Sequence, residues 1–545
     1  MIISLGRFKI RSTVIMLAIA ALTLAGALVA TAKTTPLRTA AGDVSIAAVE
    51  DDGADCPVTL PGSTPSNSRL PDPFTRVNGT RIGTKADWRC RRAEIRETAE
   101  RYVYGDKPAK PTSVTGTVSG SGITVNVSHN GRTAGFSATV QLPSGTGPFP
   151  AVIVYGGFGG DTATIRSSGA AVISFDPYSV GREGTPRNNK QGAFYSIYGN
   201  TSSTGLLAAW AWGVSRIIDV IESNGGNVLR ADIGVTGCSR FGKGAFAAGV
   251  FDQRIALTMP IESGTAGLPI YRGVNAEGGQ TLSSAYGEQP WFGDAFGSYT
   301  GNPNGLPIDT HSLVTMVAPR GLFIMDNPHI ANLGPRSASV AALGGAEVYK
   351  ALGAQNNILY HSNVSDGNHC ANRSEWRTPL QQAIGKFLRN TGSFTGGITM
   401  HSKATGNLSQ WRDWTTPTLT DGPGGTTTTT TTTTGTTTTT DTTTTTTTTT
   451  SNPPGGGSCT ATYAEGQKWS DRFNGQVTVS GTDDWVVTVT LSSPQKVIAT
   501  WNTSASWNSA GNVMTARPNG NGNVFGFTVQ HGGNWNWPAL SCRAG

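Results

Sequence analysis

Charged residues are scarce in this chain of 545 residues, because Asp, Glu, Lys and Arg together make up only 14% of it. Lys and Arg outnumber Asp and Glu and give a formal net charge of +7 at pH 7, yet they are dispersed and form no basic run. Proteins that bind nucleic acids usually gather their basic residues on one face or along one helix. We therefore attribute the charge to solubility and expect no nucleic-acid partner.

Long apolar runs are also lacking, except near the start of the chain. There an apolar stretch follows Arg7, Lys9 and Arg11 and ends in the small-residue pattern Ala30-Thr31-Ala32. This order is typical of a secretory signal, so we predict a signal peptide at residues 1–32 and a secreted, extracellular protein. The alternative is an uncleaved membrane anchor, because the stretch is nearly long enough to span a bilayer. No later segment is apolar enough to span a membrane, so we expect no membrane association after cleavage.

Cysteine occurs only six times. An even number of cysteines in an exported chain favours disulfides, and their positions narrow the possible pairings. One pair brackets the last segment, one pair lies close together near the mature N-terminus, and one pair is left. We therefore predict the disulfides Cys56–Cys90, Cys238–Cys370 and Cys459–Cys542.

Residues 422–458 consist mainly of Thr, Gly and Pro and contain no apolar side chain. Such a segment cannot bury enough surface to repay the entropy of ordering. We predict a linker here, which joins a large domain at 33–421, with its core at about 56–419, to a small domain at 459–545.

The large domain alternates strand-like runs with helical patterns. Residues 148–157 and 169–178 have the composition of buried strands, whereas residues 203–223 repeat their apolar side chains at helical spacing. This alternation is typical of a mainly parallel sheet covered by helices on both faces. The order of the elements predicts an α/β fold of the α/β-hydrolase type, a three-layer sandwich.

The stretch "GVTGCSRFGKGAF" reads as a strand that turns sharply into a helix, with Ser239 at the apex. A serine there can act as the nucleophile of an α/β-hydrolase, with helix N-terminal amides nearby to stabilise an oxyanion. The usual G-x-S-x-G pattern is only partly met, because Gly237 is present but Phe241 stands where the second glycine belongs and Gly242 follows it. The alternative is a serine that caps the helix.

A nucleophilic serine needs a histidine downstream. His369 lies in the polar loop "SDGNHCANRS", after a predicted strand and before the last helix, where this fold keeps its catalytic histidine. A Ser–His hydrogen bond of about 3 Å would also bring the neighbouring Cys238 and Cys370 within disulfide range. For the catalytic acid, the residues alone slightly favour Asp326 in "GLFIMDN" over Glu262 in "MPIESG".

Several motifs resemble those of the glucuronoyl esterases of carbohydrate esterase family 15, namely "GCSRFGKG", "IESG", "GEQPWF", "HSLVTMVAPRGLFIMDN", "LGP" and "NHC". The resemblance covers about residues 56–419. It implies Ser239 as nucleophile, His369 as base and Glu262 as acid, with Asp326 as second choice. It further implies that Arg240 stabilises the oxyanion, and that the enzyme needs no metal or cofactor. The implied sugar contacts are Lys243, Gln280 and Glu288, and Asn332 stands where fungal members have a tryptophan.

This resemblance implies hydrolysis of esters that join 4-O-methyl-D-glucuronic acid of glucuronoxylan to lignin alcohols, by a monomer that acts in lignin degradation. Within enzymes the alternative is an acetyl-xylan or feruloyl esterase. An alternative of another class is a non-catalytic protein that binds the plant cell wall.

The small domain alternates apolar and polar residues between turn signals, which predicts an antiparallel sandwich. It resembles a family 2 carbohydrate-binding module, which implies cellulose, or less favourably xylan, as the ligand. Trp469 and Trp501 match two of the three aromatic platform positions of that family. The third position reads "RPNGNG" here, so Trp507, Trp535 or Trp537 would have to replace it, and we carry Trp535 as the candidate.

Overall fold

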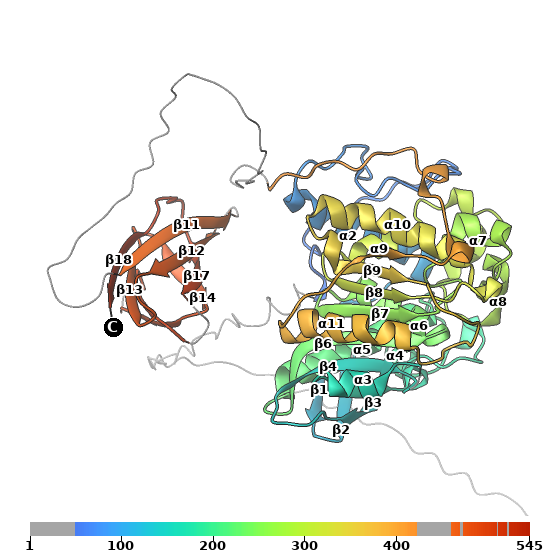
Figure 1. Cartoon of the computed structure of the whole chain (residues 1–545), viewed down its shortest axis with the longest axis horizontal. Coiled ribbons are helices and arrows are strands. Elements are labelled where there is room, and N and C mark those ends of the chain that lie inside the picture. The colour runs from blue at the N-terminus through green and yellow to red at the C-terminus, as the bar shows by residue number, and fades with distance from the viewer. Residues whose placement is uncertain are drawn as a thin grey trace, which may run out of the picture. The chain divides into compact units, whose positions relative to one another are not determined.

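The computed structural model describes residues 50–157, 159–421, 459–468, 472–508, 511–519 and 523–544. The predicted signal peptide and linker lie outside these residues, and so does Trp469. The chain divides into two compact units, Met1–Thr429 and Thr430–Gly545, which are described separately below (Figure 1).

The large unit is built on a ten-stranded sheet with the strand order β1-β2-β3-β5-β4-β6-β7-β8-β9-β10. From β5 to β10 every neighbouring pair is parallel, whereas β1, β2 and β3 add an antiparallel edge beside β5. The strands are β1 (Ser113–Val118), β2 (Gly122–His129), β3 (Arg132–Gln141), β4 (Phe149–Tyr155), β5 (Ala171–Phe175), β6 (Leu229–Cys238), β7 (Ile255–Ile261), β8 (Gly321–Met325), β9 (Ile358–His361) and β10 (Gly397–Thr399).

Helices cover both faces of this sheet (Figure 1). On one face lie α3 (Thr162–Ser167) and α11 (Ser374–Arg389); on the other lie α5 (Leu206–Asn224), α6 (Arg240–Phe251), α9 (Thr310–Val317) and α10 (Pro335–Ala351). The remaining helices are α2 (Lys85–Ala99), α4 (Ala193–Tyr198), α7 (Tyr271–Glu277), α8 (Leu282–Glu288) and the π-helix η1 (Glu100–Tyr104). Short 3-10 turns are η2 (Pro177–Ser179), η3 (Arg187–Asn189), η4 (Asp294–Tyr299), η5 (Pro303–Gly305), η6 (Ala331–Leu333), η7 (Gln355–Asn357), η8 (Ser402–Ala404) and η9 (Leu408–Gln410).

The central strands are apolar throughout because both of their faces are covered. In β4, Val152 and Val154 pack into the core on the α11 side, while Ile153 and Tyr155 pack into the core on the α5 side. The α/β-hydrolase sandwich predicted from the alternation of strands and helices is thereby confirmed.

The small unit consists of two four-stranded antiparallel sheets, which confirms the predicted sandwich. Trp485 lies in its core and stacks on Phe525, with ring centroids 5.1 Å apart. One sheet contains β11 (Thr460–Lys468), β12 (Arg472–Ser480), β17 (Val524–Gln530) and β14 (Lys496–Trp501), and the other contains β15 (Ser504–Trp507), β16 (Val513–Arg517), β13 (Trp485–Thr490) and β18 (Ala539–Ala544).

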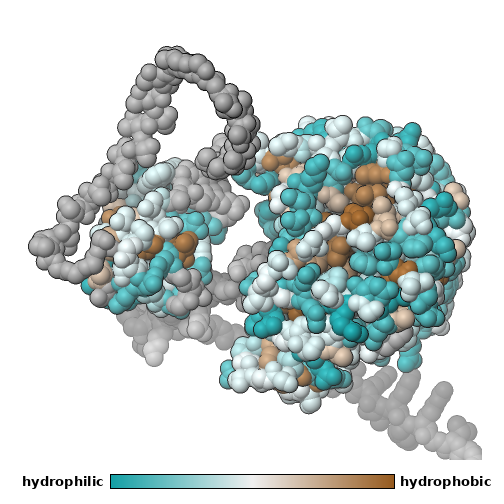
Figure 2. Space-filling view, in the orientation of Figure 1, coloured by the Kyte–Doolittle hydropathy of each residue, from teal (hydrophilic) through white to brown (hydrophobic). Residues whose placement is uncertain are grey.

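The visible face of the large unit is mainly hydrophilic, with hydrophobic residues interspersed in small groups (Figure 2). Within the described ranges, the helices are too short or too polar to cross a membrane.

Candidate active site

Ser239 is the single residue between the end of β6 and the start of α6, and its backbone adopts φ 58° and ψ −124°. A positive φ is costly for a residue with a side chain, and such strain persists where the surrounding structure imposes it, often at active sites. The Ser239 amide donates to the carbonyl of Ile261 at 2.9 Å, which ties the turn to β7. The serine side chain does not cap α6, contrary to the alternative that the sequence left open.

Two glycines make this sharp turn possible. A Cβ atom at Gly237 would lie 2.6 Å from the carbonyl oxygen of Phe241, and one at Gly242 would lie 2.5 Å from that of Ile261. The close approach of helix to strand therefore falls at Gly242 and not at position 241. This explains why the usual glycine two residues after the serine can be replaced by Phe241.

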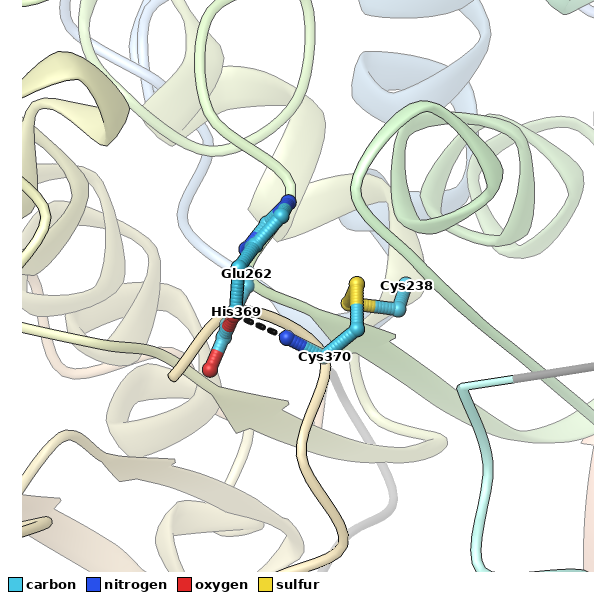
Figure 3. Close-up of side chains that lie close together, drawn as sticks. All are labelled: Cys238, Glu262, His369 and Cys370. Atoms are coloured by element: carbon cyan, nitrogen blue, oxygen red, sulfur yellow. Dashed lines mark hydrogen bonds and ion pairs between the residues drawn. A yellow bond between two sulfur atoms is a disulfide. The ribbon is translucent and has the colours of Figure 1, made fainter. Parts of the chain in front are cut away.

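His369 meets Glu262 above the ends of the strands (Figure 3). The Nδ1 atom of His369 lies 2.6 Å from Oε2 of Glu262, and the amide of Cys370 donates to the same oxygen at 2.8 Å. Glu262 is buried, whereas the His369 side chain is 41% exposed and open to a substrate. In the part of the chain that the structure describes, the Ser239 hydroxyl has no hydrogen-bond partner, so it is available for chemistry.

A disulfide joins the loop of His369 to the turn of Ser239. Cys238 and Cys370, the neighbours of these two residues, are bonded with their Cα atoms 5.7 Å apart (Figure 3). The structure also contains the two other predicted disulfides, Cys56–Cys90 and Cys459–Cys542.

Asp326 lies near this group but does not contact His369. Its carboxylate accepts from the Tyr360 hydroxyl at 2.8 Å and from the backbone amide of Asn327 at 3.0 Å. Burial raises the pKa of Asp326 to about 6. The side chain of Asn327 donates to Oε1 of Glu262 at 3.1 Å and so completes the hydrogen bonding of the other carboxylate.

Arg373 stabilises the loop of His369 through hydrogen bonds to the loop backbone. Its buried guanidinium donates to the carbonyls of Asp366 and Asn368 at 3.1 and 2.8 Å, and its Nε lies 3.8 Å from Oε1 of Glu262. This cation offsets part of the cost of burying the Glu262 charge.

Arg240 follows the serine, and its guanidinium lies between two carboxylates. Its NH1 donates to Oε2 of Glu183 at 2.6 Å, and its NH2 lies 3.7 Å from Oε1 of Glu288. The sequence carried no local signal for Glu183, which lies in a different loop. Asn327 and Arg373 lie within the motifs of Asp326 and His369, but nothing in those motifs indicated that their side chains would turn toward Glu262.

Three of the four predicted sugar-binding residues, Gln280, Glu288 and Asn332, are connected by hydrogen bonds beside Arg240. Gln280 donates from its side chain to Glu288 at 2.6 Å and from its backbone to the carbonyl of Asn332 at 2.9 Å. Asn332 is exposed. Lys243 is buried, donates to the carbonyl of Ser263 at 2.5 Å and lies 5.0 Å from the ring centre of Trp291. Burial lowers the pKa of Lys243 to about 8.

Cys238, Glu262, His369 and Cys370 place four potential metal-ligand atoms within 4.8 Å of one another. The two sulfurs are joined in a disulfide and offer no thiolate, and Glu262 already accepts from His369. The group therefore has the chemistry of an acid–base pair and not that of a metal centre.

The small unit exposes four tryptophans in the described ranges: Trp501 is 38%, Trp507 47%, Trp535 40% and Trp537 61% exposed. The indole of Trp501 lies close to Gly526, where a Cβ atom would come within 2.1 Å of it. Trp535 stacks on His531 with ring centroids 3.8 Å apart. Trp501 and Trp507 belong to different sheets, so they do not share the surface of one sheet.

Known proteins are similar in sequence to the large unit. Residues 125–353 match the family described as "Glucuronyl esterase, fungi". Over 380 residues the chain is 40% identical to the 4-O-methyl-glucuronoyl methylesterase of Hypocrea jecorina, covering 68% of this chain and 80% of that protein. Over 377 residues it is 39% identical to the enzyme of the same description from Thermothelomyces thermophilus, covering 67% of this chain and 92% of that one.

Solved structures show the same similarity. The glucuronoyl esterase catalytic domain from Hypocrea jecorina has a TM-score of 0.62 at 39% identity, and the match covers 66% of this chain and all of that one, 100%. A serine-to-alanine mutant of the glucuronoyl esterase from Sporotrichum thermophile, in complex with methyl 4-O-methyl-β-D-glucopyranuronate, has a TM-score of 0.63 at 37% identity. This match covers 67% of this chain and 99% of that chain. A carbohydrate esterase family 15 glucuronoyl esterase from Caldicellulosiruptor kristjansonii has a TM-score of 0.55 at 29% identity. This match covers 65% of this chain and 99% of that chain.

Proposed function

Because this chain belongs to the glucuronoyl esterases of carbohydrate esterase family 15, we propose that it hydrolyses esters of 4-O-methyl-D-glucuronic acid with a triad of Ser239, His369 and Glu262. The observation that carries the proposal is the 2.6 Å contact between His369 Nδ1 and buried Glu262, beside a serine on a strained turn. The contact leaves Nε2 of the imidazole as the atom that can accept a proton.

In the first half of the reaction, the Ser239 oxygen attacks the ester carbonyl while Nε2 of His369 takes its proton. Glu262 orients the imidazole and stabilises the imidazolium that forms. Arg240 stabilises the negative oxygen of the tetrahedral intermediate. When the intermediate collapses, the carbon–oxygen bond to the alcohol breaks, and the alcohol leaves with the proton from His369.

In the second half, a water molecule attacks the acyl-enzyme and gives its proton to His369. The uronic acid is released as the proton returns to Ser239. Each step uses only proton transfer and nucleophilic attack, so the proposed reaction consumes one ester and one water and needs no cofactor.

We assign recognition of the uronate to Lys243, Gln280, Glu288 and Asn332. Gln280 hydrogen-bonds to Glu288 and Asn332, and Glu288 lies 3.7 Å from Arg240. Lys243 and Arg240 both lie over the ring of Trp291. The ligand of the Sporotrichum thermophile structure supports a 4-O-methyl-glucuronate as the acid half of the ester. The alcohol half in our proposal is a lignin alcohol, and the natural substrate is a lignin–carbohydrate ester of glucuronoxylan.

We further propose that the enzyme is secreted and that its small unit binds cellulose through exposed tryptophans. Three disulfides support an oxidising, extracellular location. The close contact of the Trp501 indole with Gly526 and its 38% exposure support a stacking role, because an exposed indole can stack on the face of a sugar ring. Trp535 is the second described candidate.

The test is a comparison of rates on benzyl glucuronate, methyl glucuronate, acetylated xylan and feruloyl esters. We expect the glucuronates to be hydrolysed fastest and Ser239→Ala and His369→Ala to be inactive. The control His129→Ala, at the end of β2 in the antiparallel part of the sheet, should keep full activity. Faster turnover of the acetyl or feruloyl esters would replace the substrate assignment. No hydrolysis of any ester would favour the non-catalytic alternative.

A further inference from the structure

Glu183 is a buried carboxylate that the proposed reaction does not yet use. It lies in the loop between β5 and α4, and its side chain is only 7% exposed. Oε2 accepts from Arg240 NH1 at 2.6 Å and from the Tyr178 hydroxyl at 2.8 Å, and Oε1 accepts from the Trp291 indole at 2.6 Å. Both oxygens are thus hydrogen-bonded, and the three donors come from three separate segments of the chain.

The loop that carries Glu183 is itself anchored. The amide of Gly184 donates to Oε1 of Gln289 at 2.7 Å. Arg187 donates to the carbonyls of Phe292 and Tyr286, each at 2.7 Å, and its guanidinium lies 3.6 Å from the ring centre of Tyr286. Glu183 therefore presents its carboxylate from a fixed position.

Arg240, by contrast, has a side chain that is partly exposed to solvent. It is 40% exposed, and an arginine with such access to water samples several rotamers unless one of its ends is bound. Glu183 binds NH1 with a short charge-assisted hydrogen bond. NH2 lies 3.7 Å from Glu288, too far for a hydrogen bond, and so remains able to turn toward a new acceptor.

We propose that Glu183 is the positioning residue that holds the Arg240 guanidinium ready for the oxyanion. The inference rests on the proposed function, which gives Arg240 its role in stabilising the tetrahedral intermediate. Glu183 also offsets part of the positive charge of Arg240, and this weaker charge would stabilise the oxyanion less well. Positioning outweighs this loss, because a donor that is already oriented needs no reorganisation when the negative charge develops.

The experiment measures kcat and KM on benzyl glucuronate for the full chain and for Glu183→Gln, Glu183→Ala, Arg240→Ala and both double variants. The effect of Glu183 passes through Arg240, so we expect kcat to fall about tenfold in Glu183→Gln and more in Glu183→Ala, with KM within about twofold of the parent. In the Arg240→Ala background, either change at Glu183 should lower kcat no further, because neighbours that act as a unit are not additive.

Glu94→Gln is the matched control. Glu94 in α2 is also a buried carboxylate paired with an arginine, since it accepts from Arg91 at 2.9 Å and its side chain is 8% exposed. We expect this variant to keep kcat within about twofold of the parent. Thermal unfolding of each variant separates loss of fold from loss of rate.

Two results would overturn the inference while leaving the proposed function intact. In the first, the parent is active and both Glu183 variants have the same kcat as the parent. The other is a loss at Glu183 that adds in full to that of Arg240→Ala, as a purely structural role would. A parent that does not hydrolyse the glucuronate ester would overturn the proposed function, and this inference with it.

Discussion

At the scale of single residues, two carboxylates follow neighbouring strands and differ in their partners. Glu262 contacts His369 and Cys370, whereas Asp326 is occupied by Tyr360 and Asn327. We expect Glu262→Ala to lower kcat by about a thousandfold or more, because the imidazole loses both its orientation and its counter-charge. Asp326→Ala should cost far less. Steady-state kinetics on benzyl glucuronate measures both, and the reverse order would transfer the acid role to Asp326.

The second prediction concerns Lys243 and the dependence of KM on pH. Its pKa is about 8 in the folded protein, whereas an unfolded lysine keeps its proton to about 10.5. If the ammonium binds the sugar, KM should rise as the pH passes through about 8, and Lys243→Met should raise KM and remove this dependence. A parent KM that is flat from pH 7 to about 9 would argue against a charged contact.

The same shift has a consequence for stability. Between about pH 8 and 10.5 the unfolded chain binds the lysine proton and the folded protein does not, so this residue makes the free energy of unfolding rise with pH over that window. Below pH 8 both states are protonated and the contribution is constant. Chemical denaturation at several pH values, compared between the parent and Lys243→Met, isolates the effect.

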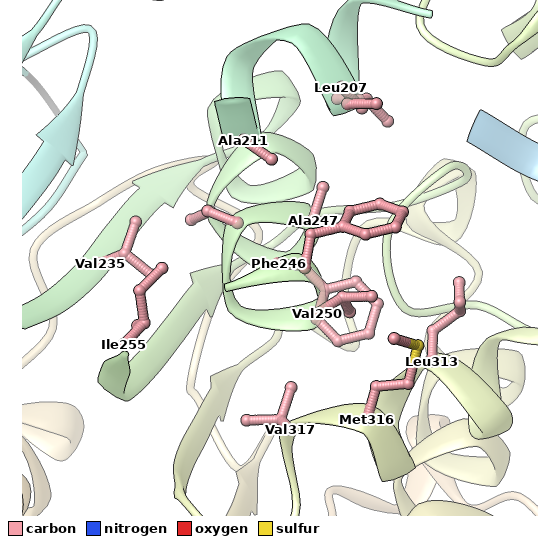
Figure 4. Packing of buried hydrophobic residues seen from close by; sticks show 14 of the residues in the cluster. Leu207, Ala211, Val235, Phe246, Ala247, Val250, Ile255, Leu313, Met316 and Val317 are labelled. Carbon is pink, nitrogen blue, oxygen red and sulfur yellow. The ribbon is translucent and has the colours of Figure 1, made fainter. Parts of the chain in front are cut away.

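At the scale of elements, the turn from β6 to α6 depends on how closely the helix approaches β7. Figure 4 shows Phe246, Ala247 and Val250 of α6 packed between α5 and α9, so the helix cannot move away. A methyl group at Gly242 would meet the Ile261 carbonyl at 2.5 Å. We expect Gly242→Ala to lower the free energy of unfolding by about 2–3 kcal/mol. Denaturant titration measures this, with exposed Gly287→Ala, which has open space around it, as the control.

The disulfide between Cys238 and Cys370 joins the turn at Ser239 to the loop of His369, whereas Cys56–Cys90 ties an N-terminal segment to α2. We expect the double serine variant of Cys238 and Cys370 to lose about tenfold or more in kcat at a temperature where it is fully folded, because the loop can drift from Ser239. The double serine variant of Cys56 and Cys90 should lose stability with kcat unchanged. Equal kcat in the two variants would show that the bridge near the site has only a structural role.

At the scale of the whole molecule, hydrolysis and attachment to the wall are predicted to be separable. The segment between the two units has no apolar residue, so its sequence provides no surface that would couple them. A chain ending near Gly425 should hydrolyse soluble glucuronate esters at the parent rate and lose retention on cellulose. A slower truncated enzyme would show that the small unit contributes to the reaction itself.

Retention on cellulose should depend on the exposed indoles. Trp501→Ala should weaken adsorption several-fold, since a stacked aromatic ring contributes about 1 kcal/mol. Trp507→Ala, in the other sheet, is the comparison with similar exposure. Binding isotherms of the two variants decide whether the surface around Trp501 is the one that meets the polysaccharide.

Much of this arrangement could be predicted from the sequence. The alternation of apolar strands and helices along the chain determined the sandwich, because a strand buried on both faces must be apolar throughout. The turn around Ser239 and the loop of His369 were recognisable because the relevant side chains are neighbours in sequence or follow a fixed chain order. The pairing of Cys238 with Cys370 followed from the positions of the other four cysteines and agreed with the expected closeness of Ser239 and His369.

The residues alone slightly favoured Asp326, and only the family resemblance implied Glu262. The tertiary structure shows which of the two contacts His369 and what surrounds Arg240. Glu262 is 107 residues from His369, and Glu183 is 57 residues from Arg240. Asp326 and Glu262 both follow parallel strands, so chain order left the choice between them open, and in the structure a hydrogen bond from Tyr360 occupies one and His369 contacts the other. Such contacts depend on where loops from distant segments of the chain meet above the sheet. A local sequence pattern carries no information on how close two such loops come in space.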